Sequence, residues 1–207
     1  MLERLRTSDV APLEVEGVEF HQVIDLPEQL EVYDFTQGYD PHRALTSPYG
    51  VGRYDERRPG MYLGEQFTEG QLDVHVGIDL AAPAGEPVHA FYEGTVFSLG
   101  DNALPYDYGP TIITRHTWRG QTVYALHGHL SRESLHRWSP GDRFTAGETL
   151  GWLGAKAVNG GWNPHLHFQL SLIAPDTHDM PGAVSVADRP WALRVFPDPR
   201  LVLGPLY

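Results

Sequence analysis

The chain of 207 residues contains no cysteine. No disulfide bond can therefore support the fold, and no thiolate can act as a nucleophile or a metal ligand. Any metal site must use His, Asp or Glu side chains. The sequence also lacks a run of about 18 consecutive apolar residues, so no segment is expected to span a membrane as a helix.

Positive charge is scarce as well. Lys and Arg together number 15 against 27 Asp and Glu, and the formal net charge is −12. Nucleic-acid-binding proteins usually present a basic surface to the phosphates, so a nucleic-acid partner is not expected. The N-terminus from Met1 to Ser8 has no long apolar run behind its charges, and it does not read as a secretory signal. The default expectation is a cytoplasmic location, with export by another route as the alternative.

The length favours one domain with a single core and extensions on either side. Residues 1–70 mix short apolar pieces with Pro, Gly, Tyr and acidic residues, and they are expected to form an N-terminal extension packed on the core. The turn from Arg57 to Gly60 within it is interpreted as a solvated loop. Residues 71–175 form the expected core, and residues 176–207 form a tail that its prolines should keep mostly irregular.

Within the core, short runs rich in β-branched and aromatic residues alternate with Gly and Pro, which favours an antiparallel β architecture. Arg119-Gly120 separates two of these runs and predicts a hairpin turn. Helical periodicity is scarce, apart from one or two turns within residues 130–138. The expected strands lie within residues 88–99, 111–116, 122–130, 149–153 and 165–172.

The segment from His165 to Leu170 strictly alternates polar and apolar residues, as a half-buried strand does. His165 and His167 should then share one face, while Leu166, Phe168 and Leu170 point into the core. The two histidines are either half of a metal site or a pair of surface residues on an edge strand.

A second alternating segment carries His75, Gly77 and Asp79 on one face. In a straight strand His75 and Asp79 would be about 13 Å apart, too far to bind one ion. The segment must bend for both to be ligands, and Gly77 permits a bend. The alternative is a buried ion pair between Asp79 and His75.

Together with one histidine of the 165/167 pair, His75 and Asp79 make a set of two histidines and one carboxylate. Such a set leaves a fourth tetrahedral position of zinc open to water, as in catalytic zinc sites. The same set also describes the site of non-haem iron oxygenases, so an iron enzyme is an alternative.

The order and spacing of further motifs are informative. Gly94-Thr-Val, Gly141-Asp and Gly147-Glu recur between the two histidine segments, and Tyr124-Ala-Leu-His127-Gly128-His129-Leu130 supplies two more histidines. Over about residues 75–170 the sequence resembles the lysostaphin/LytM-type zinc metallopeptidases, which carry His-x-x-x-Asp, a Tyr-x-His-Leu-like segment and His-x-His in this order. The resemblance implies a β-rich core of that type with a metal-binding groove.

The resemblance also implies the roles of the site residues. His75, Asp79 and His167 would bind zinc, and His129 and His165 would be the catalytic pair that does not bind the metal. His127 stands where the family usually has its tyrosine and is the alternative to His129, whose face of the strand it is expected to share. Trp162 and its neighbours replace a Ser/Thr-Gly-Pro segment and are expected to narrow one end of the groove.

The resulting expectation is a zinc metalloendopeptidase that hydrolyses peptide bonds in the cross-links of bacterial peptidoglycan. Some relatives of the resembled family have lost metal ligands and act as scaffolds, so a non-catalytic binding protein is a further alternative. All five site positions are filled in this sequence, which favours catalysis.

Overall fold

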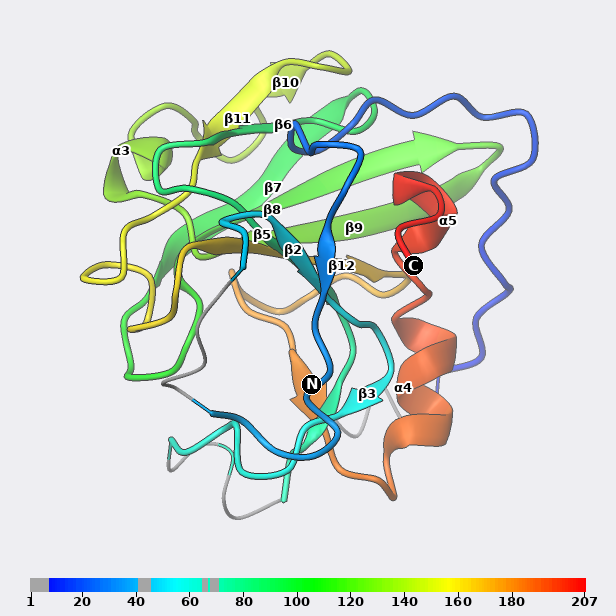
Figure 1. Ribbon diagram of the computed structural model, residues 1–207. Helices are drawn as coiled ribbons and strands as arrows, with labels where there is room; N and C mark the ends of the chain where they lie inside the picture. Colours follow the sequence, from blue (N-terminus) through cyan, green and yellow to red (C-terminus); the bar gives the residue numbers. More distant parts are fainter. Residues whose placement is uncertain (1–7, 41–45, 65–66, 68–70) are drawn as a thin grey trace.

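The computed structural model describes residues 8–40, 46–64, 67 and 71–207. In the described part of the chain, an eight-stranded sheet forms the centre of the molecule (Figure 1). In spatial order its strands are β1 (Glu31–Val32), β2 (Gly50–Gly52), β5 (Ile78–Ala81), β12 (His165–Ser171), β9 (Gln121–Gly128), β8 (Gly109–Trp118), β7 (Gly94–Asn102) and β10 (Arg143–Phe144). All neighbours are antiparallel except β1 and β2, which are parallel. The expected antiparallel β-rich core is confirmed.

Two smaller sheets flank the main one. One consists of β6 (Pro87–His89) and β11 (Thr149–Trp152), and the other has the order β13 (Ala183–Val184), β4 (Val74–His75) and β3 (Glu56–Arg57). The helices are short: α3 (Arg132–Leu135), α4 (Arg189–Val195) and α5 (Arg200–Leu203). None of the helices in the described ranges has the length and apolar character needed to cross a membrane.

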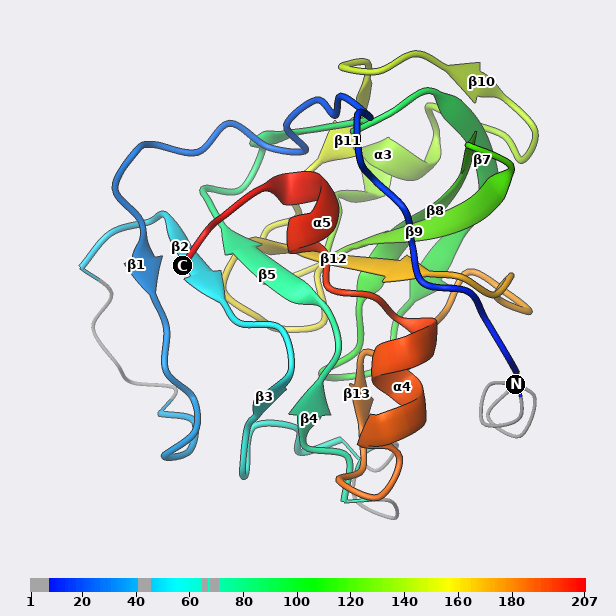
Figure 2. The ribbon, with the colours of Figure 1, turned by 90° about the vertical axis from the view of Figure 1, so that its right-hand side faces the viewer.

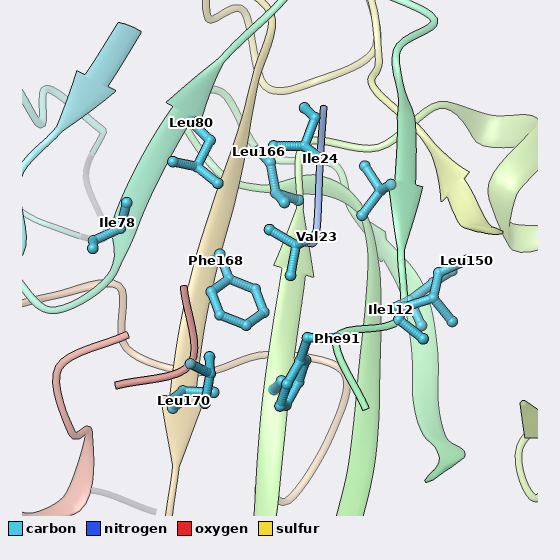
Figure 3. Close-up of a cluster of buried hydrophobic side chains, with 14 of the residues drawn as sticks. Val23, Ile24, Ile78, Leu80, Phe91, Ile112, Leu150, Leu166, Phe168 and Leu170 are labelled. Carbon is cyan, nitrogen blue, oxygen red and sulfur yellow. The ribbon is translucent and has the colours of Figure 1, made fainter. Parts of the chain in front are cut away.

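The alternating pattern of β12 sorts its side chains as predicted. Leu166, Phe168 and Leu170 are fully buried on one face, where they pack with Ile78, Leu80, Phe91 and other core residues (Figure 3). Burying one such side chain contributes about 1.5–3 kcal/mol. This packing fixes the register of β12, because a slip by one residue would move the histidines into the core.

A second apolar cluster lies around the three-stranded sheet. Val74 from β4 and Val184 from β13 pack with Trp191 and Ala192 of α4. Figure 2 shows α4 running beside β13 and β4. The cluster anchors the C-terminal segment next to His75, the last residue of β4.

The structure is more regular at both ends of the chain than the sequence suggests. Residues 1–70 contribute β1 and β2 to the main sheet and β3 to the three-stranded sheet. The tail contains β13, α4 and α5, and Trp191 and Val202 are buried. These strands are only two or three residues long, so they carry no readable period. Pro190 in the first turn of α4 suits a helix start rather than breaking it.

The expected strands are confirmed with shifted ends. The run of residues 88–99 forms parts of two strands, β6 and β7, and the expected short helix is α3. β8 and β9 form a hairpin whose turn residues, Arg119 and Gly120, have φ of 51° and 77°. Two positive φ values are typical of the tight turn that matches the twist of a hairpin.

Candidate active site

Three strands bring His75, Asp79 and His167 together. His75 ends β4 in the three-stranded sheet, and Asp79 lies in β5 of the main sheet, so the chain changes sheets between them. His167 of β12 is the direct cross-strand partner of Asp79. The interruption of the strand that the sequence required is therefore present at residues 76–77.

Gly77 is essential at this interruption for a reason of space. A Cβ atom at this position would lie 2.5 Å from Cε1 and 2.6 Å from Nε2 of His167. The imidazole of His167 therefore packs directly over the backbone of Gly77. A side chain there would displace one of the three converging residues.

The donor atoms of the three residues are close to one another. Nδ1 of His167 lies 3.1 Å from Oδ1 of Asp79 and 3.1 Å from Nε2 of His75, and the third distance, from His75 Nε2 to Asp79 Oδ1, is 3.3 Å. All three residues are buried, with no more than 9% of the surface of any of them exposed. They form the group in the described ranges whose geometry could hold a metal ion.

The second nitrogen of each histidine settles which tautomer it adopts. Nδ1 of His75 lies 3.0 Å from the carbonyl oxygen of Arg53, so Nδ1 must carry the proton and donate it. Nε2 of His167 lies 3.0 Å from Oε1 of Gln169, whose amide nitrogen donates to Pro181. His167 therefore donates from Nε2, and the nitrogens that face Asp79 are left with lone pairs.

With both imidazoles neutral, two lone pairs and a carboxylate oxygen point at one another without a hydrogen between them. Such an arrangement is repulsive unless a cation lies among the three atoms. Around zinc, ligands at about 2.0–2.2 Å in a tetrahedron would be about 3.3–3.6 Å apart, close to the distances here. The donor set and its geometry fit a zinc ion.

The surroundings of the site favour the protonation states of His75 and Asp79 that can bind a cation. Burial lowers the pKa of His75 to about 4, so the imidazole is neutral near pH 7. Burial raises the pKa of the Asp79 carboxyl, but His75 and Arg58 outweigh it and hold that pKa well below its usual value. Neutral imidazole and ionised carboxylate are the forms that bind metal ions.

His129 and His165 lie beside the three donors. Their rings have centroids 4.2 Å apart, and Nε2 of His165 is 3.7 Å from Oδ1 of Asp79. Each ring uses Nδ1 on a backbone carbonyl: His129 on Asn159 at 2.9 Å and His165 on Asn163 at 2.7 Å. Nε2 of each is therefore the proton-accepting atom. Burial lowers the pKa of both rings, so both are neutral near pH 7.

The expectation that His127 shares a face with His129 is wrong. His127 is fully buried in the core, with its ring 5.4 Å from that of Phe168 and its Nδ1 at 3.3 Å from the carbonyl of Ile112. The reason is the backbone of His129, which has a φ of 62° just after β9 ends. This conformation turns the side chain of His129 to the opposite face of the sheet from His127.

Sequence reasoning missed several residues of the site. Arg58 is only 1% exposed and donates from Nη1 to Oδ2 of Asp79 at 2.6 Å, so it does not lie in a solvated loop. Gln169 continues the alternation of His165 and His167, and this period was a signal that it faces the site. Tyr108 packs its ring 4.9 Å from His167 and 5.6 Å from His129, with no signal in the sequence pattern.

A cleft runs through the site. One cavity of about 400 Å³ is lined by the three donors, Tyr108 and residues 179–184. Another of about 300 Å³ is lined by residues 81–83 and 162–165 and by Tyr33, Phe35, Tyr39 and Asp40. Asp79, His165, Met61 and Trp162 line both. Trp162 therefore lies where the two cavities meet, rather than at one end of the groove. Its ring contacts Tyr39, Tyr62 and Tyr106.

The characterised proteins to which this chain is similar include the following two. The chain is 34% identical over 99 residues to the DD-carboxypeptidase/endopeptidase Mpg of Neisseria meningitidis, which covers 48% of this chain and 20% of that protein. It is 30% identical over 124 residues to the peptidoglycan DD-endopeptidase ShyC of Vibrio cholerae, covering 58% and 26%. The chain thus spans about a quarter or less of the length of these relatives.

Among solved structures, the catalytic domain of the prophage-encoded protein EnpA from Enterococcus faecalis is similar with 27% identity and a TM-score of 0.47, covering 69% of this chain and 92% of that one. The catalytic domain of lysostaphin from Staphylococcus simulans has 24% identity and a TM-score of 0.47, with 70% and 92% covered. The family model of peptidase family M23 matches residues 73–178, just over half of the chain. This chain therefore belongs to peptidase family M23.

Proposed function

We propose that the protein is a zinc metalloendopeptidase that hydrolyses peptide bonds in the cross-links of bacterial peptidoglycan. The observation that carries the proposal is the convergence of Nε2 of His75, Oδ1 of Asp79 and Nδ1 of His167 at mutual distances of 3.1–3.3 Å. These three residues would hold the zinc ion. Membership of a peptidase family favours hydrolysis over the iron-oxygenase alternative.

The zinc ion, when bound, would lower the pKa of a water molecule and polarise the scissile carbonyl. His165 and His129 would supply the proton transfers. With Nδ1 of each committed to a backbone carbonyl, Nε2 can accept the proton of the attacking water. The same atom, once protonated, can donate to the leaving amine. Both roles need a neutral imidazole at the start, and burial lowers the pKa of both rings in that direction.

The shape of the cleft supports cleavage within a chain rather than at its end. Asp79 and His165 line both cavities, and the cavities differ in their other walls, since one includes residues 81–83 and 163–164 while the other includes residues 179–184. A peptide could therefore extend on both sides of the bond to be cut. The name of the relative ShyC, a peptidoglycan DD-endopeptidase, supports peptidoglycan as the source of that peptide.

A digest tests the proposal. Purified peptidoglycan and free cross-link peptides are incubated with the protein, and the products are identified by mass spectrometry. We expect internal peptide bonds of the cross-links to be cut by the zinc-loaded wild type and to stay intact after chelation. His165→Ala should cut them about 10²- to 10⁴-fold more slowly. Release of terminal residues alone would contradict endopeptidase activity. Activity in the iron-loaded protein, together with no activity in the zinc-loaded protein, would favour the iron-enzyme alternative.

A further inference from the structure

Arg58 carries a charge that is out of contact with water. Its guanidinium is 1% exposed, and it belongs to the turn that follows β3, well before the first matched residue of the family model. A buried ion pair costs several kcal/mol of desolvation for each ion, and apolar side chains of similar volume often stabilise a fold as well or better. Stability alone is therefore a weak reason for an arginine at this position.

The guanidinium has a partner on each of its nitrogens. Nη1 donates to Oδ2 of Asp79 at 2.6 Å, Nε to Oε2 of Glu56 at 3.0 Å, and Nη2 to the carbonyl of Arg53 at 3.1 Å. Glu56 in turn accepts two hydrogen bonds from the side chain of Arg53. Arg53 also pairs with the carboxylate of Asp34 at 2.9 Å. Two arginines and three carboxylates thus form one network, and its inner end is Asp79.

The network contacts two of the three proposed zinc ligands, Asp79 and His75. It occupies Oδ2 of Asp79, so that Oδ1 alone faces the two histidines. The carbonyl of Arg53, which accepts from Arg58, also accepts the Nδ1 proton of His75 and so fixes the tautomer that leaves Nε2 free. Partners of this kind orient metal ligands and tune their affinity.

Gly52 makes room for this contact. A Cβ atom there would lie 2.9 Å from Nη2 of Arg58 and 2.9 Å from Oδ2 of Asp79. Gly52 pairs directly with Asp79 across β2 and β5, so the absence of a side chain lets the guanidinium reach the carboxylate.

We propose that Arg58 is a positioning residue that keeps Asp79 a zinc ligand through a single oxygen, and that the β2–β3 segment from Gly52 to Arg58 is an integral part of the metal centre. The inference rests on the proposed function, because it assigns Asp79 to zinc. It extends the centre to residues outside the 73–178 span of the family match.

The first test measures zinc affinity by competition with a chromophoric chelator, on the full chain after metal removal. Arg58→Gln should weaken zinc binding by about 10- to 100-fold, the range typical of lost partners of metal ligands. Arg57→Gln is the matched control, because Arg57 is the preceding residue and also pairs with a carboxylate, Asp73 at 2.7 Å, but its side chain is 64% exposed. We expect Arg57→Gln to bind zinc as the wild type does.

A second readout reports the coordination directly. In the cobalt-substituted protein, freeing Oδ2 allows Asp79 to bind through both oxygens, which raises the coordination number and weakens the visible absorption bands. Arg58→Gln should show weaker bands than the wild type, and Arg57→Gln should not. Gly52→Ala keeps every charge of the network but displaces the guanidinium, and it should change the spectrum and the affinity in the same direction even if Arg58→Gln fails to fold.

The outcomes separate the two proposals. If the wild type binds no zinc, the proposed function fails and the role of Arg58 fails with it. The other case is a wild type that binds zinc and variants that keep its zinc affinity and cobalt spectrum. If Gly52→Ala and Arg58→Gln both do so, the proposed function stands and the role of Arg58 is overturned. Arg58→Lys replaces Arg58→Gln in this comparison if Arg58→Gln does not fold.

Discussion

His167 and Asp79 face each other across β12 and β5, with Nδ1 of the imidazole 3.1 Å from Oδ1 of the carboxylate. Because Nε2 of His167 faces the side-chain carbonyl oxygen of Gln169, a neutral His167 turns the lone pair of Nδ1 toward the carboxylate oxygen. His75 completes the same arrangement from another sheet. The following predictions depend on this group of three and on the residues packed around it.

The proposed catalytic histidines can be separated from the ligands by mutation. His129→Ala and His165→Ala should each keep the zinc ion and lose about 10²- to 10⁴-fold in rate, as expected for a missing general acid or base. The measurements are zinc content and the rate of cross-link cleavage. His136→Ala is the control, since His136 is exposed at the end of α3. Full activity in both variants would show that the zinc site works without this pair.

His127 should have no catalytic role, because it faces the core. Under conditions in which His127→Leu is folded, its cleavage rate should lie within a few-fold of the wild-type rate. A rate as low as that of His129→Ala would contradict the assignment and favour His127 as the catalytic residue.

His127 should instead contribute to the pH dependence of stability. Burial lowers its pKa from 6.5 to about 3, so the unfolded chain binds more protons than the folded one between these values. The free energy of unfolding should therefore fall as the pH drops from about 6.5 towards 3. The contribution of one residue is at most about 1.36 kcal/mol per pH unit. Urea unfolding of the metal-free protein at several pH values should give a smaller slope for His127→Leu, and equal slopes would refute the prediction.

Gly77→Ala tests the packing of the site. Replacing glycine by alanine often stabilises a protein slightly through the unfolded chain, but here the added methyl group would collide with the ring of His167. Zinc affinity should fall by about 10-fold or more, the scale of a disturbed ligand environment. Competition with a chelator measures it. Wild-type affinity would mean that His167 can move without loss and is not a ligand.

The sequence predicts the parts of the site that lie on regular strands. The alternation from His165 to Leu170 gave the correct faces, because apolar residues at every second position fix the register. The hairpin at Arg119-Gly120 followed from local turn chemistry in the same way. The pairing of His75 with Asp79 needed only a break in the strand, and Gly77 signalled it.

The remaining features depend on contacts that no local pattern carries. Arg58 stands in an Arg-Arg-Pro-Gly turn typical of exposed loops, and its burial depends on Asp79, 21 residues away. His129 departs from the face of His127 because of a positive φ in a residue that is not glycine. The short strands β1 to β3 depend on edges supplied by distant parts of the chain, since β2 pairs with β5, β1 pairs with β2, and β3 pairs with β4.

The central claim is that His75, Asp79 and His167 hold one zinc ion. The most direct measurement is the metal content of the full chain purified without chelators. It is determined by elemental mass spectrometry for the wild type and for Asp79→Ala. The claim predicts about one zinc per wild-type chain and a strong loss in Asp79→Ala, with folding checked by circular dichroism. A folded Asp79→Ala variant with full zinc occupancy, or a wild type that cannot be loaded with zinc, would contradict it.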